Sequence, residues 1–149
     1  MDKEESTQAF LHFLLAHTVL IEWKPEYTLG IPVVDEQHRA IVATINSLHF
    51  AIQHEQGENM LQSVINMVTE YTRVHFAIEE NFFSICDFPG LEAHHEMHNA
   101  FKRSLSEIGE RCLKEKNPLE FLAFLKKWFI DHICNKDRQF KDFLLDMNR

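Results

Sequence analysis

Several side chains in this sequence have the types and the spacing of metal ligands. His75 and Glu79 are four residues apart, and so are His94 and His98. Residues four apart lie on one face of a helix, one turn above the other. Further candidates fall on neighbouring apolar stripes, so the predicted metal ligands are His38, His75, Glu79, His94, His98, His132 and Asp137.

A metal explains this set better than a metal-free core does. Each unpartnered buried polar group costs about 1–3 kcal/mol, and each buried charge costs more. A cation removes that cost by accepting the lone pairs of five imidazoles and two carboxylates. Seven ligands exceed the four of a structural zinc site and suit two adjacent ions, with Glu79 and Asp137 bridging. Zinc, copper, iron and nickel all accept imidazole with carboxylate, so these residue types leave the metal open.

The step from His132 to Asp137 does not fit a regular helix. It is five residues long, which turns Asp137 well away from the direction of His132. Two explanations remain open at this point. Either the helix is locally widened, as helices at functional sites can be, or Asp137 approaches the metals from a shifted angle.

Apolar residues at helical spacing predict the elements that position these side chains. Asp35 is the expected N-cap of the first stretch, and Pro89 with Gly90 should force a turn after the second. Short connections between helices of similar length favour antiparallel neighbours. The expected fold class is therefore all-α, an antiparallel up-down four-helix bundle. The predicted helical stretches run from Asp35 to Gly57, Leu61 to Phe82, Leu91 to Cys112 and Pro118 to Leu144.

The chain is predicted to divide into a helical leader, residues 1–21, and the bundle, residues 22–149, which starts with an extended arm. The apolar stretch from Ala9 to Ile21 is too short for a membrane span, and His12 and His17 interrupt it. The acidic start does not fit a secretory signal. We expect a cytoplasmic protein without a membrane span, whose leader packs on the body or on another subunit.

The composition excludes some partners. The net charge of −8 opposes binding to nucleic acid, because a phosphate backbone would be repelled. The spacing of the three cysteines fits neither a disulfide framework nor a zinc knuckle. They are therefore expected to be free thiols: Cys86, Cys112 and Cys134.

The motifs together resemble those of the hemerythrin family. They are W-x3-Y-x-LGI-x2-VD-x-QH from Trp23 to His38, H-x3-E at His75, H-x3-H at His94 and WFIDH-x4-D from Trp128. Their order, their approximate separations and the five-residue final step all agree, over residues 22–145.

The resemblance implies a cofactor of two non-haem irons and reversible binding of dioxygen. One iron would be held by His94, His98 and His132, and the other by His38 and His75. Glu79, Asp137 and a solvent-derived oxygen would bridge the two irons, leaving an open position for dioxygen on the second. The expected role is storage, delivery or scavenging of oxygen rather than enzymatic turnover.

Reversible binding needs a dry apolar pocket around the open position. The predicted oxygen pocket takes Trp128 and Phe129, about one turn before His132, and Ile41 and Val42, about one turn after His38. The same four residues also suit the core.

Two further positions near His132 depart from the residues that relatives often have there. Asp131 and Phe129 stand where relatives often carry Asn and Leu, so an acidic group is expected near the site. Cys134 should point away from the metals and serve packing.

Three alternatives stay open. The same site could make an oxygen or redox sensor with the N-terminal helix as its output, through a protein partner or self-association. It could be a di-iron oxidase or peroxidase, although ferritin-like oxidases use carboxylate-rich ligands with Glu-x-x-His pairs. The chain could also be a metal-free bundle.

Overall fold

The computed structural model describes residues 2–16 and 19–149 and contains helices but no strand within them. Its elements follow one another as α1 (Lys3–Ala16), the 3-10 turn η1 (Pro25–Tyr27), α2 (Pro32–Gln53), α3 (Gly57–Ile85), α4 (Leu91–Glu115), α5 (Pro118–Trp128), the π-helix η2 (Phe129–Lys136) and α6 (Asp137–Met147).

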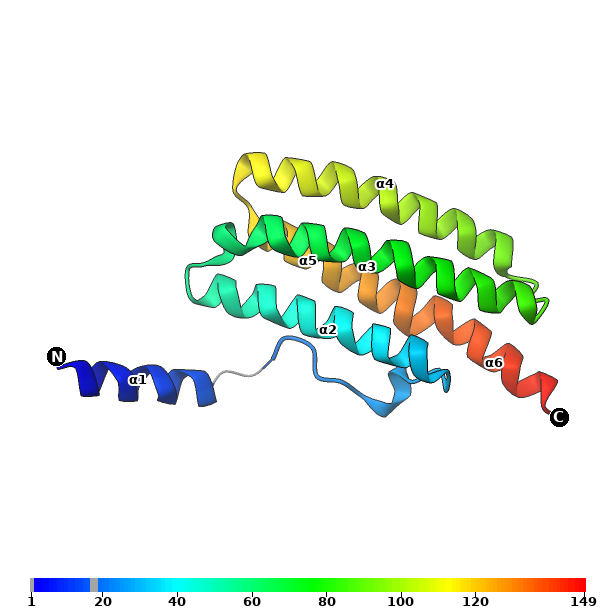
Figure 1. Ribbon diagram of the computed structural model, residues 1–149, viewed down its shortest axis with the longest axis horizontal. Coiled ribbons are helices and arrows are strands. Elements are labelled where there is room, and N and C mark those ends of the chain that lie inside the picture. Colours follow the sequence, from blue (N-terminus) through cyan, green and yellow to red (C-terminus); the bar gives the residue numbers. More distant parts are fainter. Residues whose placement is uncertain (1, 17–18) are drawn as a thin grey trace.

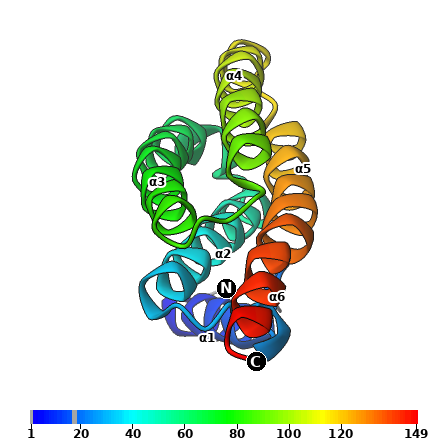
Figure 2. The same ribbon diagram turned by 90° about the vertical axis from the view of Figure 1, so that its right-hand side faces the viewer.

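Four long rods form an up-down bundle (Figures 1 and 2). The rods are α2, α3, α4 and the continuous run of α5, η2 and α6, and each runs opposite to the one before it. The helices α2 and α5 close the ring, because they contact each other as well as their neighbours in the chain. The predicted all-α antiparallel bundle is confirmed.

The predicted N-cap of α2 is wrong. The helix begins at Pro32, three residues before Asp35, because proline has no N–H to leave unbonded and its fixed φ suits a first turn. Asp35 lies within that turn, and its carboxylate binds the backbone of the arm that precedes α2. Oδ1 accepts the N–H of Leu29 at 2.7 Å, and Oδ2 accepts that of Gly30 at 3.1 Å.

All three turns between the rods use the same geometry. Each places one residue other than glycine in the left-handed region: Glu55 at φ 59°, Asp87 at φ 51° and Lys116 at φ 53°. The next residue then donates its N–H to a carbonyl five residues earlier, as Asn117 does to Cys112 at 2.9 Å. This is the Schellman ending of a helix. Gly57, expected to end the first helix, is instead the first residue of α3.

Besides Asp35, two more side chains of the bundle hold the arm between α1 and α2. The side-chain amide of Asn46 on α2 makes two hydrogen bonds to the backbone of Ile21. It accepts the N–H at 2.9 Å and donates to the carbonyl at 2.9 Å. Lys141 on α6 donates to the carbonyl of Thr28 at 2.8 Å. The arm therefore covers one side of the bundle in a defined path.

Helix α1 projects beyond the bundle (Figure 1). It touches the body through Phe10 and Phe13, whose rings meet the ring of His54 edge-on at 6.1 and 4.3 Å. No helix in the described part of the chain is long and apolar enough to cross a membrane. The division into a leader and a bundle stays a prediction, and His17 lies outside the described residues.

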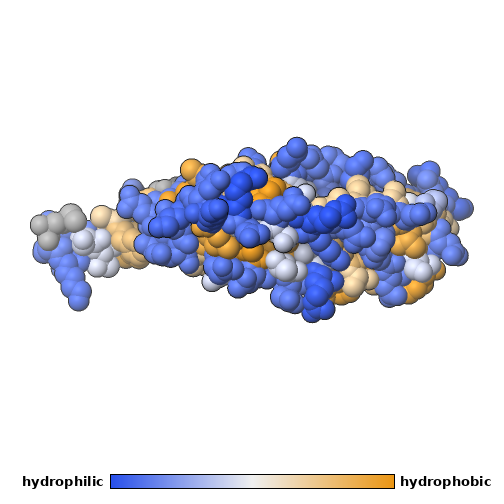
Figure 3. Space-filling model, turned by 90° about the horizontal axis from the view of Figure 1, so that it is seen from above, coloured by the Kyte–Doolittle hydropathy of each residue, from blue (hydrophilic) through white to orange (hydrophobic). Residues whose placement is uncertain are grey.

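Two apolar clusters fill the bundle, while its outer surface is mostly hydrophilic with separate apolar patches (Figure 3). The larger cluster includes Ile45, Leu48 and Phe121, and the smaller one includes Phe83 and Phe140. Each fully buried side chain of this kind stabilises the fold by about 1.5–3 kcal/mol. The three cysteines are free thiols, as predicted.

Candidate metal centre

The bundle brings all seven predicted ligands together in its interior. Each has 5% or less of its surface exposed. Every rod contributes: α2 supplies His38, α3 supplies His75 and Glu79, α4 supplies His94 and His98, and the last rod supplies His132 and Asp137.

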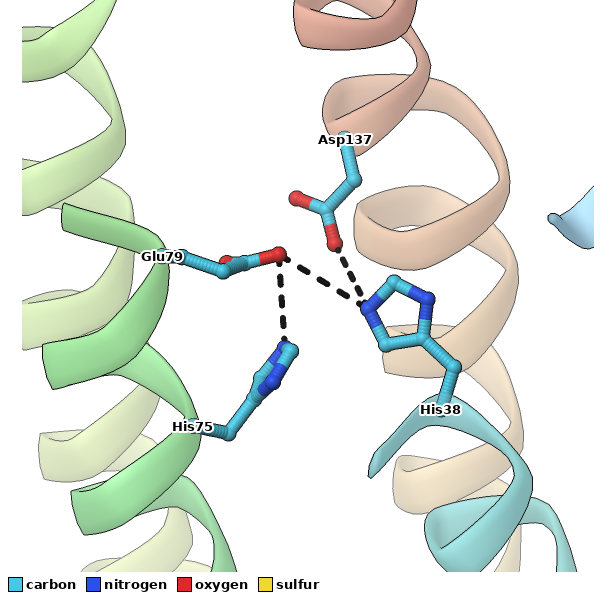
Figure 4. Close-up of side chains that lie close together, drawn as sticks. All are labelled: His38, His75, Glu79 and Asp137. Carbon is cyan, nitrogen blue, oxygen red and sulfur yellow. Dashed lines mark ion pairs between the residues drawn. The ribbon is translucent and has the colours of Figure 1, made fainter. Parts of the chain in front are cut away.

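The carboxylate of Glu79 lies between two groups of imidazoles. Its Oε1 is 3.4 Å from Nε2 of His75 and 3.7 Å from Nε2 of His38 (Figure 4). Its Oε2 is 3.3 Å from Nε2 of His98 and 3.9 Å from Nε2 of His132. The two oxygens of Glu79 therefore face different halves of the site.

Asp137 repeats this arrangement from the opposite side. Its Oδ2 is 3.3 Å from Nε2 of His38, and its Oδ1 is 3.1 Å from Nε2 of both His94 and His132. Ligand bonds of about 2.0–2.2 Å would hold neighbouring ligand atoms at about this separation. Two carboxylates that each offer one oxygen to either half have the geometry of bridging ligands.

The helix is distorted where the sequence suggested that it could be. Residues Phe129–Lys136 form a π-helix, and the N–H of Asp137 donates to the carbonyl of His132, five residues earlier. This wider turn brings both side chains to the inside of the bundle despite their five-residue separation. Of the two explanations left open by the sequence, the widened helix is the one found.

Comparison with known proteins now gives the family. The model of the Hemerythrin HHE cation binding domain matches residues 29–144. This chain belongs to the hemerythrin family. A bacteriohemerythrin of Pseudomonas aeruginosa is 34% identical over 129 residues, 86% of this chain and 82% of the relative. One of Stenotrophomonas maltophilia is 32% identical over 124 residues, 83% and 80% of the two chains. A hemerythrin-like protein of Naegleria gruberi is 24% identical over 122 residues, 82% and 92%.

The cofactor of a hemerythrin is a pair of non-haem irons, and the interior of this chain fits that group. Among the described residues, several buried ligand atoms have no hydrogen-bond partner: Nε2 of His38 and His75, both oxygens of Glu79 and Oδ2 of Asp137. Buried polar atoms are rarely left in this state, because each costs about 1–3 kcal/mol. Bound cations would satisfy all of them at once.

The charges of this hemerythrin site also favour cations. Burial alone would lower the pKa of His132, but the negative charges of Asp137 and Glu79 outweigh burial and raise it to about 10. Burial likewise acts against the charged form of His38, yet Asp137 and Glu79 raise its pKa to about 9. For Glu79, burial acts to raise the pKa, but the surrounding imidazoles hold it well below its usual range. The two carboxylates therefore favour the protonated form of these imidazoles, and iron has to displace those protons when it binds.

Two side chains outside the ligand set orient histidines of the hemerythrin site. Nδ1 of His75 is 2.8 Å from Oε1 of Gln37, and Nδ1 of His98 is 2.8 Å from Oε1 of Glu80. A proton held on each Nδ1 leaves Nε2 as the ligand atom. Neither residue was predicted from the sequence, although each lies directly beside a predicted ligand in the chain.

Aromatic rings enclose the imidazoles. Phe76 stacks on His98 with ring centroids 3.8 Å apart, Trp128 stacks on His132 at 5.6 Å, and Tyr71 stacks on His75 at 5.2 Å. Neither Phe76 nor Tyr71 was predicted to lie at the site.

The predicted pocket residues are all buried in the larger apolar cluster: Ile41, Val42, Trp128 and Phe129. Trp128 touches a ligand ring, and Phe129 meets the ring of Tyr27 edge-on at 5.3 Å. Cys134 is partly buried and packs against the same cluster. Asp131, expected to bring an acidic group near the site, is exposed.

Proposed function

We propose that this hemerythrin binds dioxygen reversibly at its iron pair. His94, His98 and His132 would hold one iron, His38 and His75 would hold the other, and Glu79 and Asp137 would be shared between them. The observation that supports this most is the unequal division of imidazoles around two shared carboxylates. The half with two imidazoles offers fewer protein ligands, and a bound iron pair would supply a reversible exchange of two electrons with dioxygen.

The side chains around the irons protect that exchange. Trp128, Phe129, Ile41 and Val42 are buried in one apolar cluster and would exclude water from the oxygen pocket. Gln37 and Glu80 accept the Nδ1 protons of two ligands and so keep these rings from turning. A dry pocket with fixed ligands leaves no external acid to convert bound oxygen irreversibly.

The ligand chemistry favours a carrier over an oxidase. The site has five imidazoles and two carboxylates, whereas ferritin-like oxidases surround their metals mainly with Glu and use Glu-x-x-His pairs. We propose storage, delivery or scavenging of oxygen in the cytoplasm as the role.

An oxygen titration of the reduced protein, with iron measured on the same sample, tests this function. We expect two irons per chain and a visible absorption band that appears with oxygen and disappears when oxygen is removed. His98→Ala should abolish the band, whereas His12→Ala, which changes an exposed histidine of α1, should keep it. Irreversible oxidation, or steady consumption of oxygen with a reductant, would contradict the carrier function.

The position of α1 favours a second candidate, an oxygen sensor. Phe10 and Leu11 on α1 are 50% and 45% exposed, so this helix offers an apolar surface to a protein partner or to another copy. A sensor should change the exposure of α1 between its oxygen-free and oxygen-bound states. Limited proteolysis of both states measures this. Equal cleavage rates within residues 2–16 would exclude the sensor while leaving reversible oxygen binding intact.

A further inference from the structure

A groove lies between α3 and α4, outside the ring of metal ligands. Its volume is ≈ 450 Å³. Thr72 and Leu105, both buried, form its floor, and the partly buried Ile65 and Leu113 form apolar walls. Its exposed or partly exposed rim is polar. We call this feature the α3–α4 groove, and its rim consists of Thr69, Arg73, Lys102, Ser106 and Glu110.

Two contacts between α3 and α4 lie on either side of the groove. At one end α4 carries Gly109, and a Cβ there would lie 3.4 Å from Cγ2 of Ile65, so the two helices are close. At the other end the ammonium of Lys102 lies over the ring of Phe76, 5.8 Å from its centroid. The groove opens between these contacts.

The rim carries two cations although the whole chain has a net charge of −8. Glu110 is the carboxylate among the residues that line the groove, and Glu70 lies beside Arg73 outside that lining. Nε of Arg73 is 3.0 Å from Glu70, which leaves its two Nη groups as donors. Lys102 has no carboxylate within ion-pair distance among the described residues. An anion would therefore find hydrogen-bond donors here, in contrast to most of the acidic surface.

We propose that the α3–α4 groove binds a small amphipathic organic anion, namely a free monocarboxylate with a short alkyl chain. The carboxylate would be held by Arg73 and Lys102, with the hydroxyl of Ser106 as a further donor. The alkyl chain would lie on Ile65, Leu105 and Leu113. The groove is within the range of about 300–1,000 Å³ typical of small-molecule sites, and like them it combines an apolar lining with a few polar groups. This proposal does not depend on oxygen binding, because none of the ligand imidazoles lines the groove.

Titration of the iron-loaded protein with octanoate tests the site. Calorimetry should show one saturable site per chain for octanoate in its monomeric form. Octanol and octylammonium share the chain but lack the negative charge, and they should bind at least about fivefold more weakly, as expected for the loss of two exposed ion pairs. Equal binding of all three would reduce the groove to an unspecific apolar surface and overturn the proposal, as would the absence of saturation.

Variants locate the binding. Lys102→Met and Arg73→Met keep apolar stems and should each weaken octanoate binding by about two- to fivefold. Arg103→Met removes a charge from the adjacent, exposed position outside the groove and should leave binding unchanged. Ser106→Phe fills the groove from its rim and should abolish binding, with circular dichroism verifying the fold. Binding that survives Ser106→Phe, or that falls equally in Arg103→Met, would overturn the proposal.

Discussion

Asp137 donates its backbone N–H to the carbonyl of His132, five residues earlier, where a regular α-helix would bond it to Ile133. The π-helix of residues Phe129–Lys136 thus inserts one residue into the last rod of the bundle. Both side chains consequently reach the interior, and Oδ1 of Asp137 lies 3.1 Å from Nε2 of His132. An irregular stretch of backbone is what completes the site.

Inserting an alanine after Asn135 should cost the protein its iron. The extra residue places Asp137 six positions after His132, so Asp137 turns away from the site by about 100°. We expect fewer than two irons per chain by elemental analysis and a lower melting temperature, because Phe140 turns out of its buried position as well. Asn135→Ala changes the same exposed position without changing the length of the segment and should retain both irons. Full iron content in the folded insertion variant would show that the last rod absorbs a further residue without loss of the site.

Loss of the orienting side chains should weaken metal binding. Gln37→Leu removes the acceptor 2.8 Å from Nδ1 of His75, and Glu80→Ala removes that of His98. Such changes typically cost about 10–100-fold in metal affinity. Competition with a chelator measures the affinity. Glu36→Ala, at the exposed position beside Gln37, is the matched control, and Gln37→Glu should retain most of the affinity because it keeps an acceptor.

Removal of iron should destabilise the bundle. The apoprotein must bury five imidazoles and two carboxylates, and several of their ligand atoms lack hydrogen-bond partners. A ligand present at about 100–1,000 times its Kd stabilises the folded state by about 3–4 kcal/mol. For a chain of this size that corresponds to roughly 5–15 °C in Tm. Calorimetry before and after chelation gives the shift, and readdition of iron should reverse it. An unchanged Tm would show that the fold does not depend on the metal.

The sequence predicted the rods and the cluster of buried histidines and carboxylates because both depend on local spacing. His75 and Glu79 share a face in any helix, and apolar stripes on either side fix which face is inside. The start of α2 was missed because two signals competed there. Pro32 and Asp35 each suit a first turn, and the hydrogen bonds that decide between them involve Leu29 and Gly30 in the arm.

Contacts between side chains of different rods could not be predicted from local spacing in the sequence. Glu80 reaches His98 on the next helix, and Gln37 reaches His75 across α2 and α3. Whether an exposed-looking polar residue turns inward depends on how two helices rotate against each other, which a stripe of apolar residues sets only coarsely. The five-residue step could be recognised as irregular, yet only the backbone hydrogen bond of Asp137 decides how the helix absorbs it.

Glycine substitutions at two nearby lysines, Lys116 just after α4 and Lys114 in its last turn, should change the stability of the protein in opposite directions. Lys116 has φ 53°, a conformation that costs a residue with a Cβ but not glycine. Lys116→Gly should therefore raise the free energy of unfolding by about 0.5–1 kcal/mol. Lys114 lies inside the last turn of α4, where glycine is unfavourable, so Lys114→Gly should lower it by about the same amount. Urea unfolding of the iron-loaded variants measures both, and equal destabilisation would contradict the strain assigned to Lys116.

Enlarging the proposed oxygen pocket should speed oxidation of the oxygen-bound protein. Phe129 is 1% exposed and belongs to the buried apolar cluster that includes Trp128. Phe129→Leu keeps an apolar side chain but leaves space that water can enter, and water with its protons promotes irreversible loss of bound oxygen. We expect the rate of autoxidation, followed by the decay of the visible band in air, to rise several-fold while iron content stays at two per chain. Ile130→Leu changes the neighbouring, 45% exposed position and should leave the rate as it was. If both variants oxidise at the rate of the unaltered protein, Phe129 serves the core alone and the oxygen pocket lies elsewhere around the irons.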